Sequence, residues 1–153
     1  MGKAVKYVIS GFPRMRSAWL CALLNAHGSR CIHDSLTYGM DCEGISDPAV
    51  ACLGIDVGAT KIYVHRDEGW LAAYESFIGC KMPEMEVDKW REHVSVYSSS
   101  ALKFRYTDLD RNSVVGEILE ACSIKPVDHL IDAFQQFKVE QHLPKARLRW
   151  DFN

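Results

Sequence analysis

The chain has 153 residues, and its 18 Lys and Arg against 20 Asp and Glu give a formal net charge of −2 at pH 7. This length suits one domain with a real hydrophobic core, and the nearly neutral charge disfavours a nucleic-acid-binding protein, which is usually basic. The sequence has no apolar run of the ~20 residues that span a membrane, and residues 1–6 lack the apolar region of a signal peptide. We therefore expect one cytoplasmic domain over residues 1–153, with no nucleic-acid or membrane partner.

The six cysteines form no C-x-x-C pair, and most of them lie within apolar runs. Cysteines in such runs behave as small hydrophobic residues. Together with the missing secretion signal, this pattern predicts reduced thiols rather than a disulfide framework. It also gives no reason to expect a zinc or other metal site.

A strand, a tight loop and a helix are predicted over residues 5–25, VKYVISGFPRMRSAWLCALLN. Residues 7–9 form an apolar run typical of a buried strand, Gly and Pro at 10–13 end it, and the apolar periodicity of 18–24 indicates a helix. Such a loop directs free backbone N–H groups at an anion. Arg14, Arg16 and Ser17 add two guanidinium groups and a hydroxyl, which suit phosphate or sulfate. The alternative is an ordinary loop with solvated arginines.

This loop differs from the loop G-x-x-x-x-G-K-[ST] of nucleoside triphosphatases. Counting from Gly11, Arg16 stands at the second Gly position, Ser17 at the Lys position and Ala18 at the Ser/Thr position. The lysine for phosphate and the hydroxyl for magnesium are therefore absent, which disfavours a standard kinase or ATPase. The pattern leaves an anion cradle that works without a metal.

Residues 11–20, GFPRMRSAWL, resemble the 5′-phosphosulfate loop of sulfotransferases, written G-x-P-[KR]-S-G-T-T-W-L. The residues that fit that pattern include Pro13, Arg14, Ser17, Trp19 and Leu20. Three depart from it: Met15, Arg16 and Ala18.

A short strand is predicted next, over residues 29–34, after a helix end at Gly28. It ends in His33 and Asp34. If this strand is parallel to the first, both side chains lie near the anion loop, where open α/β sheets bind ligands. Either is a candidate general base, with Asp56 as a further candidate. A solvated strand end is the alternative.

Residues 36–47 are rich in Gly, Asp and Ser and are expected to form a loop or a weak helix that faces the substrate. An apolar stretch at 48–55 precedes a strand at 61–65. Since parallel neighbours need a long crossover, either the stretch at 48–55 is partly helical or the two strands are not adjacent parallel partners.

Residues 61–74 resemble the sulfotransferase run K-[IV]-[IV]-Y-[VL]-x-R-[DN]-P-x-x-[VA]-x-x-S, whose arginine binds the 3′-phosphate of the nucleotide. Arg66 falls on that arginine, Tyr74 on the serine and Glu68 on the proline. The resemblance implies that Arg66 and Tyr74 contact the nucleotide. An ion pair with Asp67 or Glu68 is the alternative for Arg66.

The remaining chain alternates helices with one strand. Helices are expected at 70–78, at 82–93 with Met85, Trp90 and Val94 on an apolar face, at 113–122 with Asn112 or Ser113 as cap, and at 128–137. Residues 97–100 are expected to form a turn. Residues 101–109 predict a strand that resembles the sulfotransferase segment [VL]-x-[YF]-E-D-L. The basic tail at 145–150 is either a solvated segment or a flap over the nucleotide.

Taken together, the resemblance implies an α/β, three-layer P-loop-like domain with a mainly parallel sheet of four or five strands and helices on both faces. It implies a sulfotransferase that moves a sulfonyl group from 3′-phosphoadenylyl sulfate (PAPS) to an acceptor hydroxyl or amine without a metal. Its catalytic residues would be Arg14, His33 and Asp34. Its cofactor-binding residues would be Pro13, Arg14, Met15, Arg16, Ser17, Ala18, Trp19, Arg66 and Tyr74. A non-catalytic nucleotide- or anion-binding protein on the same fold is the alternative, and a nucleoside-phosphate kinase is the weakest of the three.

Overall fold

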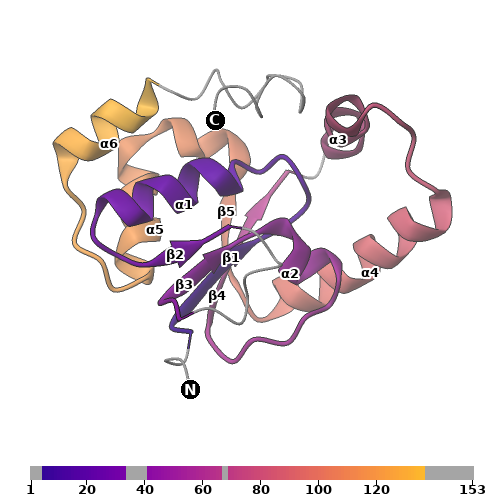
Figure 1. The fold of residues 1–153 in the computed structure, drawn as a ribbon, viewed down its shortest axis with the longest axis horizontal. Coiled ribbons are helices and arrows are strands. Elements are labelled where there is room, and N and C mark those ends of the chain that lie inside the picture. The colour runs from indigo at the N-terminus through magenta and orange to yellow at the C-terminus, as the bar shows by residue number, and fades with distance from the viewer. Residues whose placement is uncertain (1–4, 34–40, 67–68, 137–153) are drawn as a thin grey trace.

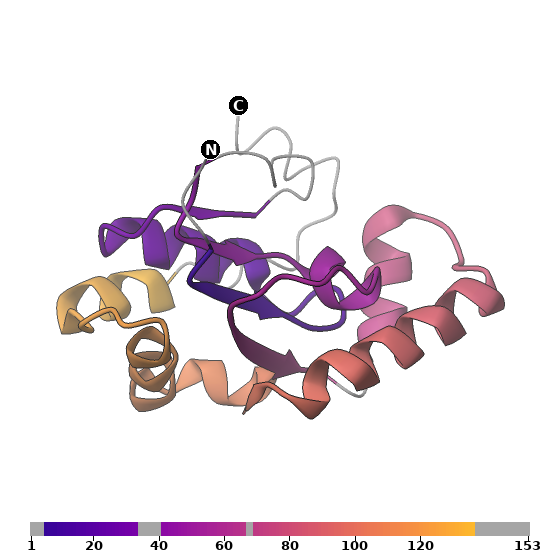
Figure 2. The ribbon, with the colours of Figure 1, turned by 90° about the horizontal axis from the view of Figure 1, so that it is seen from below.

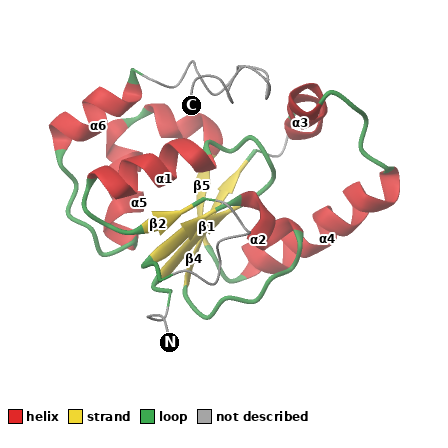
Figure 3. Ribbon diagram, in the orientation of Figure 1, coloured by secondary structure: helices red, strands yellow, loops and turns green. Residues whose placement is uncertain are grey.

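The fold is built on a five-stranded parallel sheet, seen in a computed structural model that describes residues 5–33, 41–66 and 69–136. The strand order is β2-β3-β1-β4-β5 (Figures 1 and 3). The strands are β1 (Tyr7–Ser10), β2 (Cys31–Ile32), β3 (Gly44–Ser46), β4 (Thr60–His65) and β5 (Leu102–Arg105). Every pairing in the sheet is parallel. The predicted α/β class with a parallel sheet is confirmed.

Helices cover both faces of the sheet (Figures 1 and 2). On one face lie α1 (Ser17–Ala26), α5 (Asn112–Ala121) and α6 (Asp128–Gln135). On the other lie α2 (Pro48–Cys52) and α4 (Glu84–Ser99). Helix α3 (Trp70–Ile78) stands apart from the sheet, and a 3-10 helix, η2 (Tyr106–Asp110), follows β5.

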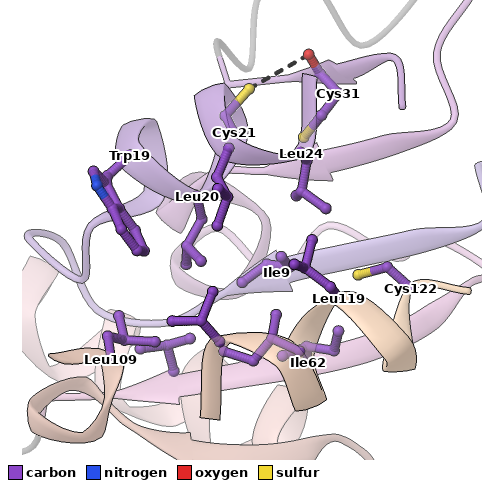
Figure 4. Packing of buried hydrophobic residues seen from close by; sticks show 14 of the residues in the cluster. Ile9, Trp19, Leu20, Cys21, Leu24, Cys31, Ile62, Leu109, Leu119 and Cys122 are labelled. Atoms are coloured by element: carbon purple, nitrogen blue, oxygen red, sulfur yellow. Dashed lines mark hydrogen bonds between the residues drawn. The ribbon is translucent and has the colours of Figure 1, made fainter. Parts of the chain in front are cut away.

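The central strands divide the hydrophobic core into two clusters because successive side chains of a strand point to opposite faces. Ile9 of β1 and Ile62 of β4 pack with Leu20 of α1 and Leu119 of α5 (Figure 4). Val8, between two residues of that cluster, packs on the opposite face with α2 and α4. Burying each such side chain stabilises the fold by about 1.5–3 kcal/mol. The sheet is thereby held between two apolar layers.

Several predicted helix ends are confirmed by their glycines and caps. Helix α1 ends at Ala26, and Gly28 has a φ of 88°. Helix α3 ends at Ile78, and Gly79 has a φ of 79°, the left-handed conformation that glycine adopts freely. The stretch at 48–55 is partly helical, which was one of two alternatives. Its helix α2 begins at Pro48, where the Asp47 carboxylate accepts the Ala49 N–H at 2.9 Å.

The predicted turn at 97–100 is wrong, because α4 continues through Ser99. The reason is the burial of Tyr97, whose hydroxyl lies 2.8 Å from the Ile62 carbonyl oxygen and 3.1 Å from that of Val8. This phenol therefore ties the helix to two strands. Met85 is wrong as a core residue, since it is 74% exposed, and the buried face of α4 is Val87, Val94 and Tyr97.

Three further predictions are corrected or refined. Part of the segment expected to be loop or weak helix, residues 44–46, is strand β3. Neither expected cap bonds the start of α5, and the Asn112 amide instead donates to Asp132. The strand expected at 101–109 ends at Arg105 and gives way to η2.

All six cysteines are free, and only Cys80 among them is exposed. Within the described ranges, no helix is both long and apolar enough to cross a membrane. The basic tail at 145–150 lies outside the described residues.

Candidate functional site

A cavity of about 560 Å³ opens at the carboxyl edge of the sheet. All five strands are parallel, so the loops that leave them start at this same edge, where open α/β sheets bind ligands. The loop after β1 contributes Arg14, the end of β3 leads to Asp47, the end of β4 leads to Arg66 and the end of β5 leads to Tyr106. Topology alone therefore brings four distant segments to one place.

Most of the predicted site residues line this cavity. They are Pro13, Arg14, Arg16, Ser17, Ala18, Trp19, His33, Arg66 and Tyr74. Met15 does not, because its side chain is fully buried in the core. Asp34 lies outside the described residues. Asp56 is exposed between α2 and the start of β4, at the opposite edge of the sheet, so it is wrong as a candidate base.

The loop backbone has an unusual conformation before α1. Arg14 and Arg16 both have a φ of 68°, the left-handed region that costs a non-glycine residue about 1–2 kcal/mol. Arg16 is the N-cap residue, and no side chain caps the helix. The first-turn N–H groups of an α-helix have no partner within the helix. Together with the positive end of the helix dipole, they form a ready anion site beside Ser17.

The Arg14 side chain is half-buried, and its Cζ atom lies 4.2 Å from the centre of the Phe77 ring on α3. Burial lowers the pKa of Arg14 below its ordinary value, the charge of Arg66 lowers it further, and Tyr106 acts in the opposite direction. Arginine keeps its charge at neutral pH despite such shifts. This guanidinium is therefore a partly desolvated cation, which is the strongest kind of partner for a phosphate group.

Arg66 ties the anion loop to the sheet. Its Nη1 donates to the Arg14 carbonyl oxygen at 2.7 Å, and its Cζ lies 4.4 Å from the centre of the Tyr106 ring. The alternative of an ion pair with residues 67 or 68 falls outside the described residues. Arg66 thus contacts the same loop that carries Arg14, and its guanidinium lines the cavity.

Arg16 is the most deeply placed of the three arginines, with 9% of its side chain and backbone exposed. Its Nη1 lies 2.9 Å from Asp110 Oδ1, so the two side chains form an ion pair. The N–H bonds of Nη1 do not point at that oxygen closely enough to form a hydrogen bond. Its buried Nε has no hydrogen-bond partner among the described residues. Buried donors without acceptors are costly, so this guanidinium suits a site that receives an anion.

His33 lies at the end of β2 and lines the cavity from an exposed position. Its strand is parallel to β1, as required, but β3 lies between the two. The Nδ1 atom is 2.7 Å from the Ser46 carbonyl oxygen. Since a carbonyl only accepts, Nδ1 carries the hydrogen, and in the neutral ring Nε2 is then the acceptor. This tautomer is the one that a general base at Nε2 requires.

Sequence reasoning missed several residues of the cavity wall. Asp47 is a carboxylate with 7% exposure that lines the cavity at the end of β3, and its position before Pro48 is the typical signal of a helix start. Phe77 and Trp90 form an aromatic wall with Tyr74, whose ring centre lies 5.5 Å from that of Trp90. The spacing of Trp70, Tyr74 and Phe77 on one helix face could have indicated this wall.

Among the described residues, no group of three or more His, Cys, Asp or Glu side chains is arranged to hold a metal ion. No known protein-family profile matches the chain, and no curated protein matches it in sequence. Among solved structures, the chain is similar to the mouse sulfotransferase SULT7A1 complexed with PAP, with 13% identity and a TM-score of 0.49. The similarity covers 88% of this chain and 65% of that one, so the chain spans less than two thirds of that protein.

Proposed function

We propose that the cavity binds a nucleotide that carries phosphate and phosphosulfate groups, and that the protein is a sulfotransferase that uses PAPS. The observation that carries this proposal is the convergence of Arg14, Arg16 and Arg66 with the uncapped start of α1 on one cavity. The sequence resemblance of residues 11–20 and 61–74 to the two nucleotide-binding segments of sulfotransferases supports it.

The residues present fit such a ligand. Three guanidinium groups give planar donors for phosphate oxygens, and Asp110, which pairs with Arg16, offsets only part of their charge. The Nε of Arg16 is a buried donor that has no acceptor among the described residues, and a bound anion would supply one. In this assignment the α1 N–H groups and Ser17 hold the 5′-phosphosulfate, while Arg66 and Tyr74 face the 3′-phosphate.

PAPS supplies the sulfonyl group, whose transfer to an acceptor oxygen or nitrogen leaves adenosine 3′,5′-bisphosphate and releases the acceptor proton. His33 accepts that proton at Nε2, because Nδ1 is held as a donor by the Ser46 carbonyl. Asp34 is the second candidate for this role. Arg14 and the N–H groups of α1 stabilise the negative charge that builds up on the leaving phosphate. These groups are held before the reaction, so they need little reorganisation.

A non-catalytic nucleotide-binding protein is the second candidate. It is favoured by Arg16, which takes a left-handed conformation with a φ of 68° where the sulfotransferase loop has Gly. Its guanidinium then fills space next to the anion site. Ala18 and Tyr74 also replace hydroxyl-bearing Thr and Ser residues of the family pattern. These departures keep the donors that would bind an anion, but they remove contacts to the nucleotide that the sulfotransferase pattern implies.

Calorimetric titration with adenosine 3′,5′-bisphosphate in the absence of magnesium tests the site. We expect micromolar binding that Arg14→Ala and Arg66→Ala each weaken tenfold or more, about 1.4 kcal/mol. Arg91→Ala is the matched control, since Arg91 is an exposed arginine of α4 that lies 4.0 Å from Asp88, away from the cavity. Absence of binding by a folded protein contradicts the proposed function, and binding that requires magnesium favours a kinase.

Catalysis is separated from binding by His33→Gln. This variant is expected to bind the nucleotide as the wild type does and to lose transfer by about 10²–10⁴-fold, the usual contribution of a general base. Transfer is measured with labelled PAPS and a panel of hydroxyl and amine acceptors. A wild type that binds the nucleotide and transfers to none of them supports the non-catalytic candidate.

A further inference from the structure

The short helix η2 lies beside the arginines because of the strand register. His65 of β4 and Arg105 of β5 are register partners at the ends of their strands. Arg66 and Tyr106, which directly follow these two strands, therefore leave the sheet at the same level. The strand pairing thus places the Tyr106 ring next to the Arg66 guanidinium.

Tyr106 contacts two guanidinium groups at once. The Cζ of Arg66 lies 4.4 Å from the ring centre and the Cζ of Arg16 lies 4.9 Å from it, both within the ~6 Å range of a cation–π contact. Asp110, four residues along the same helix, pairs with Arg16 at 2.9 Å. The Tyr106 ring and the Asp110 carboxylate, which both contact the Arg16 guanidinium, thus come from η2.

Such support is needed because like charges gathered at one end of a cavity repel one another. Burial and the charge of the neighbouring Arg66 both lower the pKa of Arg14. The negative face of an aromatic ring attracts each guanidinium without neutralising it. Asp110 already offsets the charge of Arg16, and a second carboxylate in place of the ring would also cancel the charge of Arg66, which an anionic ligand requires.

We propose that Tyr106 is a positioning residue whose ring holds the guanidinium groups of Arg16 and Arg66 at the anion end of the cavity before a ligand arrives. Asp110 fixes Arg16 from η2 in the same state. The part of this inference that concerns nucleotide affinity rests on the proposed function. The part that concerns the free protein does not, because the contacts exist without a ligand.

The experiment compares Tyr106→Leu, which removes the ring, with Tyr106→Phe, which keeps it. In the free protein, the ¹H–¹⁵N correlations of the arginine Nε–H groups are expected to show ring-current shifts for Arg16 and Arg66. These shifts are retained in the Phe variant and lost in the Leu variant. Their absence from the wild type overturns the proposal, whatever the ligand proves to be.

Affinity for adenosine 3′,5′-bisphosphate is then measured for the same proteins at a temperature at which all of them are fully folded. The Leu variant is expected to bind about tenfold more weakly, and the Phe variant within about threefold of the wild type. Equal loss in both variants overturns the proposal, because the hydroxyl would then be responsible. Equal affinity in all three proteins overturns it as well.

Asp110→Asn tests the second contact without touching the core, since the Asp110 side chain is 56% exposed. It is expected to broaden or shift the Arg16 Nε–H signal and leave that of Arg66 in place. Asp108→Asn, on the same short helix and outside the cavity lining, is the matched control. If the wild type binds no nucleotide, the proposed function fails, and the arginine signals still decide the positioning role.

Discussion

The two walls of the cavity are built in different ways. At the anion end, six of the ten residues of α1 are buried, and Arg66 bonds the loop to the end of β4. On the aromatic side, Trp70 is the one buried residue of α3, and the helix stands between Gly69 and Gly79, both at positive φ. Figure 1 shows α3 apart from the sheet, whereas α1 lies on it.

This difference follows from what each wall has to do. Recognition of an anion by fixed donors depends on direction, and donors that must reorganise lose much of their electrostatic value. Contact with an apolar group has no direction, so a loosely attached helix serves it well. We therefore expect the charged end of the cavity to be rigid and its aromatic wall to be adaptable.

The largest expected effect is a difference in how much a truncation in each wall lowers the free energy of unfolding. Leu20→Ala in α1 removes a fully buried side chain and should lower the free energy of unfolding by about 2–5 kcal/mol. Ile78→Ala in α3 removes a half-buried one and should cost about 1 kcal/mol or less. Urea denaturation measures both. Equal costs would mean that α3 is part of the core and would remove the distinction.

Two glycine substitutions sharpen the same comparison. A β-carbon at Gly11 would collide with the carbonyl oxygen of Val64, so Gly11→Ala should cost about 1–3 kcal/mol and weaken nucleotide binding by moving the anion loop. At Gly79 the described residues, its chain neighbours aside, place no atom within 4 Å of the added carbon, and the strain of a φ of 79° alone should cost about 1 kcal/mol. Denaturation and calorimetric titration provide the two readouts. Weaker nucleotide binding in the Gly79 variant than in the Gly11 variant would contradict the assignment.

Alkaline pH tests how much the two buried thiols beside the sheet contribute to the free energy of unfolding. Burial raises the pKa of the Cys52 and Cys122 thiols to about 12, whereas an unfolded thiol has a pKa near 8.5. The folded state then holds more protons, so stability is full below pH ~8.5 and falls as the pH rises toward 12. The loss at pH 9 is about 1 kcal/mol or less for each thiol.

Cys122→Ala should flatten this decline in the free energy of unfolding, measured by urea denaturation from pH 7 to 10. Cys80→Ala is the matched control, because Cys80 is exposed just after α3 and should leave the slope unchanged. An unchanged slope in the Cys122 variant would show that other groups dominate the alkaline range.

The smallest expected effect concerns the contact between the two walls. Phe77→Leu removes the ring that lies 4.2 Å from the Arg14 guanidinium carbon. Nucleotide affinity should fall about threefold, near the lower limit for a cation–π contact. The free energy of unfolding should change little, because Phe77 is only half-buried. A tenfold loss of affinity would make the aromatic wall part of the anion site.

By itself, the sequence determined the elements whose signals are local. Strand β1, helix α1 with its end before Gly28, helix α3 with its end at Gly79 and the inner face of α5 all follow from side-chain periodicity and turn residues. The short loop before α1 was also predictable, because its Gly, Pro and arginines lie within six residues of one another. These features depend on neighbours in the chain.

Tertiary structure alone decided the rest. Strand β3 has three residues and no periodic signal, and it enters the sheet between β2 and β1 because Gly44 leaves room for the Tyr7 ring. Helix α4 runs through Tyr97 because that phenol finds carbonyl partners on β1 and β4. Arg16 contacts Tyr106 and Asp110 because the pairing of β5 with β4 places both residues beside it. In each case the deciding partner is distant in the chain, so no local pattern carries the information.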